Sequence, residues 1–232
     1  ESLRKNEKEY GVKLHQIDFI RTPYDLRNIK AYKQLVQLMK REKFDAIHCN
    51  TPIGGVLGRL AGKKCKVRKI IYQAHGFHFY KGASKKNWLI YYPIEKWLAK
   101  YTDALITINN EDYELAKSRF QLRHNGKVYY VPGVGIDLSQ YDLSDGIREK
   151  KRTELGLKET DFALISMGDL IERKNYSVAA YTKKIKKLAN DETVRKTMGK
   201  NSLVAIQKFN METVEIAVSK VYKSELNDIT SI

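Results

Sequence analysis

His75 is the side chain of this sequence whose position best suits chemistry. It follows a short apolar run, Ile70 to Tyr72, of the β-branched and aromatic type that favours a buried strand, and it precedes Gly76, which permits a sharp turn. In open α/β sheets, ligands bind just beyond the carboxyl ends of the strands. A histidine there can contact a substrate, but a lone histidine beside glycine is also common as a structural or half-exposed turn residue. Both interpretations stay open on these residues alone.

A second candidate site lies further along the chain, where the segment 168–175 follows a predicted buried strand at residues 161–167. Arg173 and Lys174 supply cationic donors on a loop, and such donors are well suited to hold a diphosphate. In a chain as basic as this one, a solvated basic turn is an equal alternative.

Two glycine-containing loops are further candidates. In the first, Thr51 precedes Gly54 and Gly55 at the predicted start of a helix, where backbone N–H groups can converge on an anion. The spacing lacks the full dinucleotide-binding pattern, so plain turn chemistry explains it equally well. In the second, Gly133 and Gly135 follow a strand end between two predicted units. They indicate either the floor of a cleft or a rigid turn between domains.

Residues 77–100 interleave aromatic and basic side chains. Such a surface fits phosphate contacts and base stacking in a nucleic-acid binder, or headgroup contacts and interfacial anchors at a membrane. It also fits a helix that packs its aromatic residues in the core and leaves its lysines in water. We expect Tyr80 to Trp88 to form an interaction surface and Trp97 to pack in the core.

Strands and helices must alternate for these loops to meet at one edge of a sheet, and the hydrophobic pattern predicts that they do. Strands are expected at residues 12–19, 44–49, 69–74, 103–108 and 128–131. Helices are expected at 28–43 with Asn28 as N-cap, from 56 on, at 86–101, and from Asn109 or Asn110 to 120. Short all-apolar strands in this order indicate a parallel sheet with helices on both faces.

A polar linker at residues 138–146 separates this sheet from a second α/β unit. There we expect a basic helix at 147–155 ended by Gly156, the strand at 161–167, and two helices, 183–200 and 211–226, separated by residues 199–201. The sequence therefore predicts two domains, residues 1–137 and 138–232, the second with only one clear strand.

Composition and charge limit the kinds of partner that the protein is expected to bind. The chain has 43 lysine and arginine residues against 27 acidic ones, a formal charge of +16 and a pI near 9.6. This balance favours an anionic partner, which can be nucleic acid, an anionic membrane surface or a phosphorylated substrate. Cys49 and Cys65 lack metal-ligand spacing and fit a reducing, cytoplasmic setting.

Five long segments carry a resemblance. They are FDAIHCNTPIGGVLGRLAG, YQAHGFHFYKGASKKNWLIYYPIEKWLAKYTDALITINNEDYELAK, YVPGVGIDL, LGLKETDFALISMGDLIERKN and LANDETVRKTMGKNSLVAIQKFNMETVEIAVSKVY, in that order. Together they resemble bacterial glycosyltransferases of family 4, above all the capsular and exopolysaccharide enzymes.

This resemblance implies two facing Rossmann-like domains, the GT-B arrangement, with a sugar nucleotide in the cleft and transfer with retention of anomeric configuration. It also implies that neither a metal nor a cofactor is needed. His75 matches the family's histidine that contacts the donor sugar at the reaction centre, and Lys174 matches the lysine that holds the leaving diphosphate. The other implied donor-side positions are Gly76, Gly133, Gly135, Gly168, Arg173 and Asn175, and the acceptor-side positions are Thr51, Gly54, Gly55, His78, Tyr80 and Lys81.

The chain departs from the family pattern in three places. Where many relatives carry arginine ahead of the lysine it has Asp169, which weakens the expected phosphate clamp unless Arg173 compensates. The family's first strand and glycine-rich loop are not found before Glu1. Between about Ala179 and Tyr181 the sequence jumps to the closing helices, without the family's pair of glutamates seven residues apart. We therefore expect an N-terminal domain without its first strand, an incomplete C-terminal domain, and a truncated or gapped sequence.

From these residues and this resemblance we expect a retaining glycosyltransferase of capsule or exopolysaccharide synthesis. It would move a sugar from a nucleotide-sugar, a UDP-sugar by family analogy, to a lipid-linked or saccharide acceptor. It would be cytoplasmic and peripheral on the inner face of the membrane, whose anionic surface fits the +16 charge. One alternative is a basic nucleic-acid-binding module, against which the strict βαβ order argues. The other is a catalytically dead fragment that keeps only acceptor or membrane contacts.

Overall fold

The computed structural model describes residues 10–141, 146–158, 160–161, 163 and 178–227. The chain forms two compact units. The first comprises residues up to 134 together with those from 214 on, and the second comprises residues 135–213. The domain boundary expected after residue 137 stays a prediction.

The first unit is built on a parallel four-stranded sheet in the order β1-β2-β3-β4. Its strands are β1 Ala46–Asn50, β2 Lys69–Ala74, β3 Ala104–Thr107 and β4 Lys127–Tyr130. The central strands β2 and β3 are buried almost throughout, as expected for all-apolar strands covered on both faces. The predicted α/β class, with Rossmann-like alternation of strands and helices, is confirmed.

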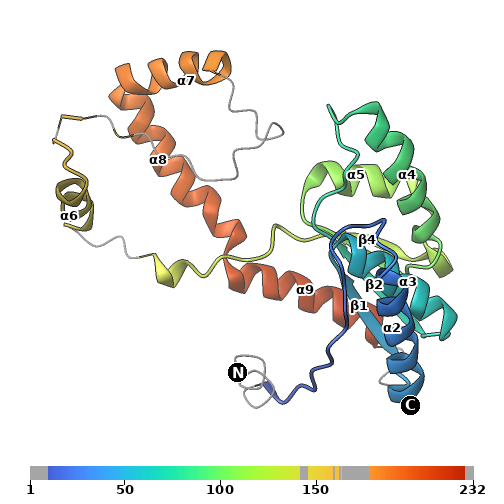
Figure 1. Ribbon diagram of the computed structural model, residues 1–232. Helices are drawn as coiled ribbons and strands as arrows, with labels where there is room; N and C mark the ends of the chain where they lie inside the picture. Colours follow the sequence, from blue (N-terminus) through green and yellow to red (C-terminus); the bar gives the residue numbers. More distant parts are fainter. Residues whose placement is uncertain (1–9, 142–145, 159, 162, 164–177, 228–232) are drawn as a thin grey trace. The chain divides into compact units, whose positions relative to one another are not determined.

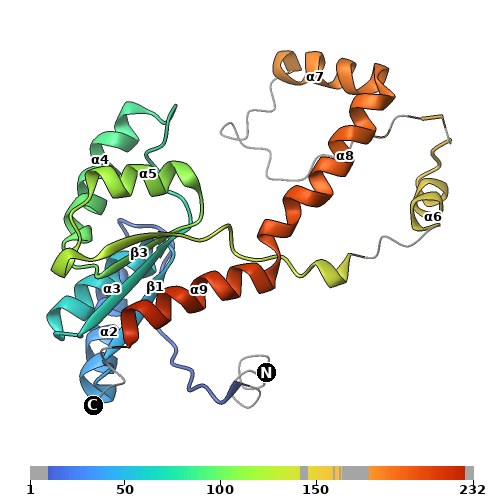
Figure 2. The same ribbon diagram turned by 180° about the vertical axis from the view of Figure 1, so that it is seen from behind.

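Helices cover both faces of this sheet (Figures 1 and 2). On one face the cores contain residues of α2 Asn28–Glu42, α3 Pro52–Lys64, α4 Lys85–Ala99 and α5 Asn110–Arg119. On the other face lies α9 Met211–Leu226, which belongs to the first unit from Val214 on. Among the described residues, no helix combines the length and the apolar character needed to cross a bilayer.

Helix α3 packs directly against side chains of the sheet because glycines line its inner side. Gly55, Gly58 and Gly62 lie on one face of the helix. Side chains of the sheet face each of them directly. A Cβ atom at residue 55 would overlap the Tyr72 ring, and one at residue 58 would lie 2.5 Å from the Cys49 Sγ atom. The segment GGVLGRLAG is therefore a packing surface as well as a turn.

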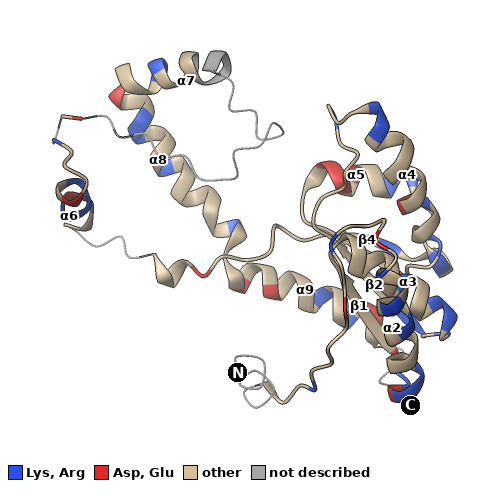
Figure 3. Ribbon diagram, viewed as in Figure 1, with Lys and Arg blue, Asp and Glu red and all other residues tan. Residues whose placement is uncertain are grey.

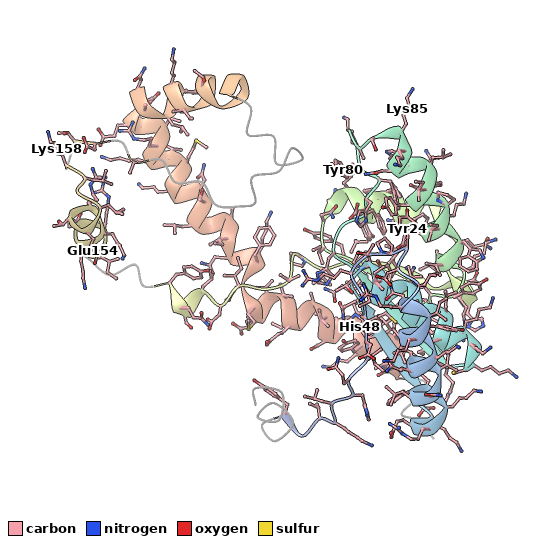
Figure 4. The ribbon with its side chains drawn as sticks, viewed as in Figure 1. Tyr24, His48, Tyr80, Lys85, Glu154 and Lys158 are labelled. Carbon is pink, nitrogen blue, oxygen red and sulfur yellow. The ribbon has the colours of Figure 1, made fainter. Side chains whose placement is uncertain are left out.

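Polar contacts fasten α9 to the sheet. The Tyr222 hydroxyl lies 2.6 Å from Nδ1 of His48, where α9 meets the sheet in Figure 4. Glu225 accepts a hydrogen bond from the Tyr129 hydroxyl at 2.6 Å and pairs with Lys69 at 3.1 Å. These contacts join the C-terminal helix to strands β1, β2 and β4.

The second unit contains α6 Ile147–Glu154, α7 Val178–Asn190 and α8 Glu192–Ile206. The predicted helix break at residues 199–201 was wrong, because α8 runs through them. The turn lies instead at Asp191, whose carboxylate accepts a hydrogen bond from the backbone N–H of Val194 at 2.8 Å and caps α8. The predicted strand at 161–167 lies outside the described residues except for positions 161 and 163, which have no regular structure.

Three further expectations for the first unit were wrong. Residues 12–19 do not form a strand, because within the described part of the chain no strand pairs with them. Side chains of α2 take over some of the pairing: the backbone N–H of Asp18 donates to Gln34, and that of Ile20 donates to Asn28, each at 3.0 Å. The Asn28 side chain therefore bonds residues that precede the helix. The N-cap of α2 is Arg27 and not Asn28 as predicted.

Trp97 is the other correction. It was expected in the core, but 47% of its surface is exposed, and it packs edge-on against Tyr101 with ring centroids 5.2 Å apart. Successive helical residues point about 100° apart, and the inward positions at this end of α4 belong to Leu98 and Ala99, which are fully or nearly fully buried. Helix α4 continues without a break through Pro93.

The glycine surface of α3 gives a first testable prediction. Gly55→Ala should lower the free energy of unfolding by about 1–3 kcal/mol, because the methyl group overpacks the contact with Tyr72. Gly54→Ala is the matched control. Its Cβ would meet only the Thr51 hydroxyl, at 3.0 Å, so its effect should stay below about 1 kcal/mol. Urea denaturation followed by circular dichroism measures both, and equal losses would contradict this packing.

His48 gives a prediction for pH. Burial, with a smaller contribution from repulsion by His75, lowers the pKa of His48 below its usual 6.5. The unfolded chain therefore binds this proton more readily than the folded chain. The contribution of neutral His48 is complete above about pH 6.5 and is lost as the pH falls through the lower folded value. Unfolding free energies measured between about pH 7.5 and about pH 5.5, roughly one unit either side of the usual histidine pKa, should fall less steeply for His48→Gln. Identical slopes would show that His48 does not titrate this way.

Candidate functional site

His75 stands exposed at the carboxyl edge of the sheet. It directly follows β2, and its Nε2 atom lies 3.2 Å from the Oδ1 atom of Asn50, the last residue of β1. The next residue, Gly76, has φ +124°, so the chain turns there with a backbone that other residues rarely adopt. The structure thus places the imidazole where the sequence predicted it, within reach of solvent and oriented by a neighbouring strand.

The loop after Gly76 is anchored by alternate aromatic side chains. Phe77 and Phe79 point into the core and stack with ring centroids 4.8 Å apart, and Phe79 is completely buried. Between them, His78 points the other way and lies against Tyr91 of α4, with ring centroids 4.7 Å apart. Burial of the two phenylalanines therefore determines where His78 lies.

Asp112 holds the same loop from α5. Its carboxylate accepts hydrogen bonds from the Phe77 N–H at 2.9 Å and from the Asn109 side chain at 2.7 Å. Burial raises the pKa of Asp112, although both hydrogen bonds oppose the shift. The sequence predicted only that Asp112 lies in the first turn of α5, where a negative charge favours the helix dipole. Its contact with the loop after His75 was not predicted. Of the two predicted caps, Asn109 and Asn110, the structure shows that Asn109 is the N-cap of α5.

A pocket of about 700 Å³ opens beside this edge, within the first unit. Four predicted site residues lie in its wall: Thr51, Gly54, Gly76 and His78. Most of the remaining wall is aliphatic or aromatic and comes from residues 19–24, α3 and α4. The strand ends thus supply Asn50, Thr51 and His78, and the helices and the N-terminal segment supply most of the apolar wall together with the charged Arg21 and Glu95.

A buried ion pair stiffens the pocket wall. Arg59 of α3 is only 1% exposed, and its guanidinium lies over the Tyr72 ring, 3.9 Å from the centroid. It pairs with Glu95 of α4 at 2.9 Å and donates to the Gly55 carbonyl at 2.8 Å. A buried charge needs such partners, because an unpaired one is costly to desolvate. An arginine inside the apolar run VLGRLAG was the signal in the sequence that could have revealed this pair.

The N-terminal segment completes the pocket. The buried Asn28 side chain accepts from the Ile20 N–H and donates to the carbonyls of Ile20 and Thr22, at 3.0–3.1 Å. These bonds fix residues 20–22 although they form no strand. Tyr24, labelled in Figure 4, and Tyr91 of α4 both line the pocket, and burial raises the pKa of Tyr91.

Thr51 has a backbone conformation that is rare for any residue except glycine. Its φ is +65° and its ψ is 159°, and its side chain makes no capping bond although it stands at the N-cap of α3. Such conformations cost about 1–3 kcal/mol and are concentrated at functional sites. The position of Thr51 in the pocket wall fits that pattern.

Other predicted residues lie apart from the pocket wall. Gly55 is buried behind it, against Tyr72. Tyr80 accepts a hydrogen bond from the Trp88 indole at 3.3 Å, and the Lys81 N–H donates to Glu111; Figure 4 labels Tyr80 near the start of α4. Gly133 lies just past β4 with φ +73°, and Gly135, with φ +89°, belongs to the second unit. Gly168, Arg173, Lys174 and Asn175 lie outside the described residues.

The outer side of α4 combines lysines with exposed apolar residues. Lys85 and Lys86 stand at its start and Lys96 near its end, where Figure 3 shows basic segments along the helix. Leu89 is 78% exposed and Trp88 36%. Trp88 therefore belongs both to the aromatic core around Phe79 and to the surface, as the expected interaction surface requires.

Fold and site together define a Rossmann-like α/β protein with a pocket at the carboxyl edge of its first sheet. Comparison with known proteins gives the family. The model of the family "Glycosyl transferase 4-like" matches residues 1–109. This match confirms the resemblance that the motifs carry.

Curated relatives extend this finding. A Bacillus subtilis (strain 168) protein named "Putative glycosyltransferase EpsD" is 43% identical over 158 residues, 67% of this chain and 41% of that protein. An Escherichia coli protein named "UDP-Gal:alpha-D-GlcNAc-diphosphoundecaprenol alpha-1,3-galactosyltransferase" is 29% identical over 190 residues, 81% of this chain and 49% of that protein. The Klebsiella pneumoniae "Uncharacterized 41.2 kDa protein in cps region" is 29% identical over 160 residues, 65% of this chain and 43% of that protein. The chain spans less than half the length of each relative.

The strained backbone at Thr51 is testable by stability. Thr51→Gly should raise the free energy of unfolding by about 1 kcal/mol, because relief of 1–3 kcal/mol of strain exceeds the entropy cost of glycine. Ser84→Gly is the matched control. Ser84 also stands at an N-cap, with an ordinary φ of −59° and a real capping bond, so this variant should lose a few tenths of a kcal/mol. Guanidinium titrations compare the two, and a loss at both positions would argue against strain at Thr51.

Proposed function

We propose that this chain is part of a retaining glycosyltransferase that transfers a sugar from a nucleotide-sugar to a lipid-linked or saccharide acceptor. The pathway is the synthesis of capsule or exopolysaccharide. The observation that carries the proposal is the exposed His75 at the sheet edge of a unit that matches the glycosyl transferase 4-like family. The names of the relatives support the reaction class, and one of them names a UDP-sugar donor and a diphosphoundecaprenol-linked acceptor.

The proposed chemistry is displacement at the anomeric carbon of the donor sugar. His75 contacts that sugar, and Asn50 orients the imidazole through the 3.2 Å hydrogen bond. As the bond to the diphosphate breaks, negative charge grows on the leaving group, and positive side chains stabilise it. In this proposal Arg173 and Lys174 supply that charge, Asn175 and Gly168 are further donor-binding positions, and neither metal nor cofactor takes part.

The acceptor binds in the pocket beside His75. Thr51, Gly54 and His78 lie in its wall, close in sequence to the strand ends that carry Asn50 and His75. The ion pair of Arg59 and Glu95 keeps this wall in place. The site therefore offers the acceptor a fixed position next to the reacting sugar, which is the main contribution that positioning makes to a transfer reaction.

The protein works at the surface of an anionic membrane, on the cytoplasmic side. Exposed Leu89 and Trp97 on α4, with Lys85, Lys86 and Lys96 beside them, have the chemistry of an interfacial helix that inserts apolar side chains below anionic headgroups.

Vesicle binding tests this part of the proposal. Phosphatidylglycerol vesicles should sediment the protein and phosphatidylcholine vesicles should not. Lys85→Glu with Lys86→Glu should weaken sedimentation at least tenfold, because each lysine near the surface contributes about 1 kcal/mol. The same change of charge on α2, Lys33→Glu with Lys40→Glu, is the control and should have a smaller effect. Equal effects would mean that net charge alone attracts the membrane.

His75→Ala tests the reaction. In the complete gene product it should lower kcat at least a hundredfold while changing the affinity for the nucleotide-sugar severalfold at most, because a contact made at the reaction centre strengthens in the transition state. His124→Ala, at the opposite end of the strands beside Asp103, is the control and should leave kcat unchanged. Equal losses of kcat and donor affinity would restrict His75 to binding.

A further inference from the structure

We propose that the pocket of the first unit binds hydrocarbon, namely the first isoprene units of a lipid-linked diphosphate acceptor. This inference rests on the proposed function for the identity of the acceptor, but the pocket itself argues for the apolar part. In this proposal the hydrocarbon chain lies against the helices that line the pocket. The diphosphate attached to the chain lies toward the strand ends.

The chemistry of the wall favours hydrocarbon over sugar. Ile53 and Val56 of α3 and Ile94 of α4 line the pocket together with Phe19 and Pro23. A saccharide placed against these side chains would lose water from its hydroxyl groups without gaining hydrogen bonds in return. An isoprenoid chain loses no hydrogen bonds there and gains from burial of its own apolar surface. The wall is therefore complementary to lipid.

The charges at the pocket suit an anionic lipid. The carboxylate of Glu95 lies in the wall, but Arg59 neutralises it at 2.9 Å, so it does not repel a diphosphate as a free carboxylate would. The exposed Arg21 also lines the pocket and can pair with a phosphate oxygen. Helix α3 begins at Pro52, so its first turn, at Thr51 to Gly54, adds unpaired backbone N–H groups.

Hydrogen bonds within the protein hold part of the apolar wall in place. Asn28 is buried and fixes residues 20–22 through three hydrogen bonds, although these residues are in no strand. Tyr24 of the same segment and Tyr91 of α4 both line the pocket, so the segment lies beside the helix there. The volume, about 700 Å³, is in the usual range of about 300–1,000 Å³ for small-molecule sites. It accommodates the start of a long isoprenoid chain, and the remainder stays in the bilayer.

Direct binding of farnesyl diphosphate tests the inference without any turnover. Calorimetric titration, run below the micelle concentration of the probe, should give an affinity at least tenfold higher for farnesyl diphosphate than for inorganic pyrophosphate. Equal affinities would overturn the inference, because the hydrocarbon would then contribute nothing.

Variants at two exposed isoleucines locate the site. Ile94→Asn, in the pocket wall and 41% exposed, should weaken farnesyl diphosphate at least tenfold and leave pyrophosphate unchanged. Ile216→Asn is the matched control, because Ile216 lies on α9, 50% exposed and outside the pocket wall, and this variant should bind normally. Tyr24→Ala, at a residue 69% exposed, is a second wall variant and should also weaken the lipid probe. An equal loss in Ile216→Asn and Ile94→Asn would overturn the inference.

A transfer assay separates failure of this inference from failure of the proposed function. If the complete gene product uses a water-soluble saccharide diphosphate without a lipid chain at the same KM as the lipid-linked acceptor, the transferase proposal stands and the hydrocarbon site is overturned. If no sugar is transferred but farnesyl diphosphate binds and Ile94→Asn weakens it, the hydrocarbon site stands and the transferase proposal fails.

Discussion

The close approach of helix α3 to strands β1 and β2 is the constraint on which the first unit depends. Glycine at residue 55 leaves room for the Tyr72 ring, and that ring in turn lies under the guanidinium of Arg59. Because α3 is held so near the sheet, its first turn, with Thr51 and Gly54, lies beside the ends of β1 and β2. The packing of one helix thereby brings two of the predicted acceptor-side residues, Thr51 and Gly54, into one pocket wall.

Buried polar groups then hold the surrounding segments in place. Arg59 and Glu95 join α3 to α4, Asp112 holds the loop after His75, and Asn28 fixes the segment that precedes α2. Each is largely buried and hydrogen-bonded, so removing one partner would leave another unsatisfied, at a cost of about 1–3 kcal/mol. The edge of the sheet is consequently rigid around an exposed His75, which is the arrangement that a positioned transfer reaction requires.

Local patterns in the sequence predicted the strands well and the tertiary contacts poorly. The run at residues 69–74 predicted β2 to the residue, because a buried parallel strand is apolar throughout. Residues 12–19 alternate as a strand should, but pairing decides whether a strand forms, and no local pattern shows it. Gly55 was considered as a ligand-binding or turn residue, and its contact with Tyr72 was not predicted because it depends on how two elements approach each other. Asp112 and Arg59 were missed for the same reason, since their partners are 35 and 36 residues away.

A double-mutant cycle at Gly55 and Tyr72 tests the central constraint most directly. Unfolding free energies are measured for Gly55→Ala, Tyr72→Val and the double variant. If the Tyr72 ring is what excludes a side chain at residue 55, the smaller valine makes room for the methyl group. The double variant should then be more stable than the sum of the single effects predicts by about 1 kcal/mol or more, within the usual range for residues in contact. Additivity within about 0.5 kcal/mol, as for independent sites, would contradict the account.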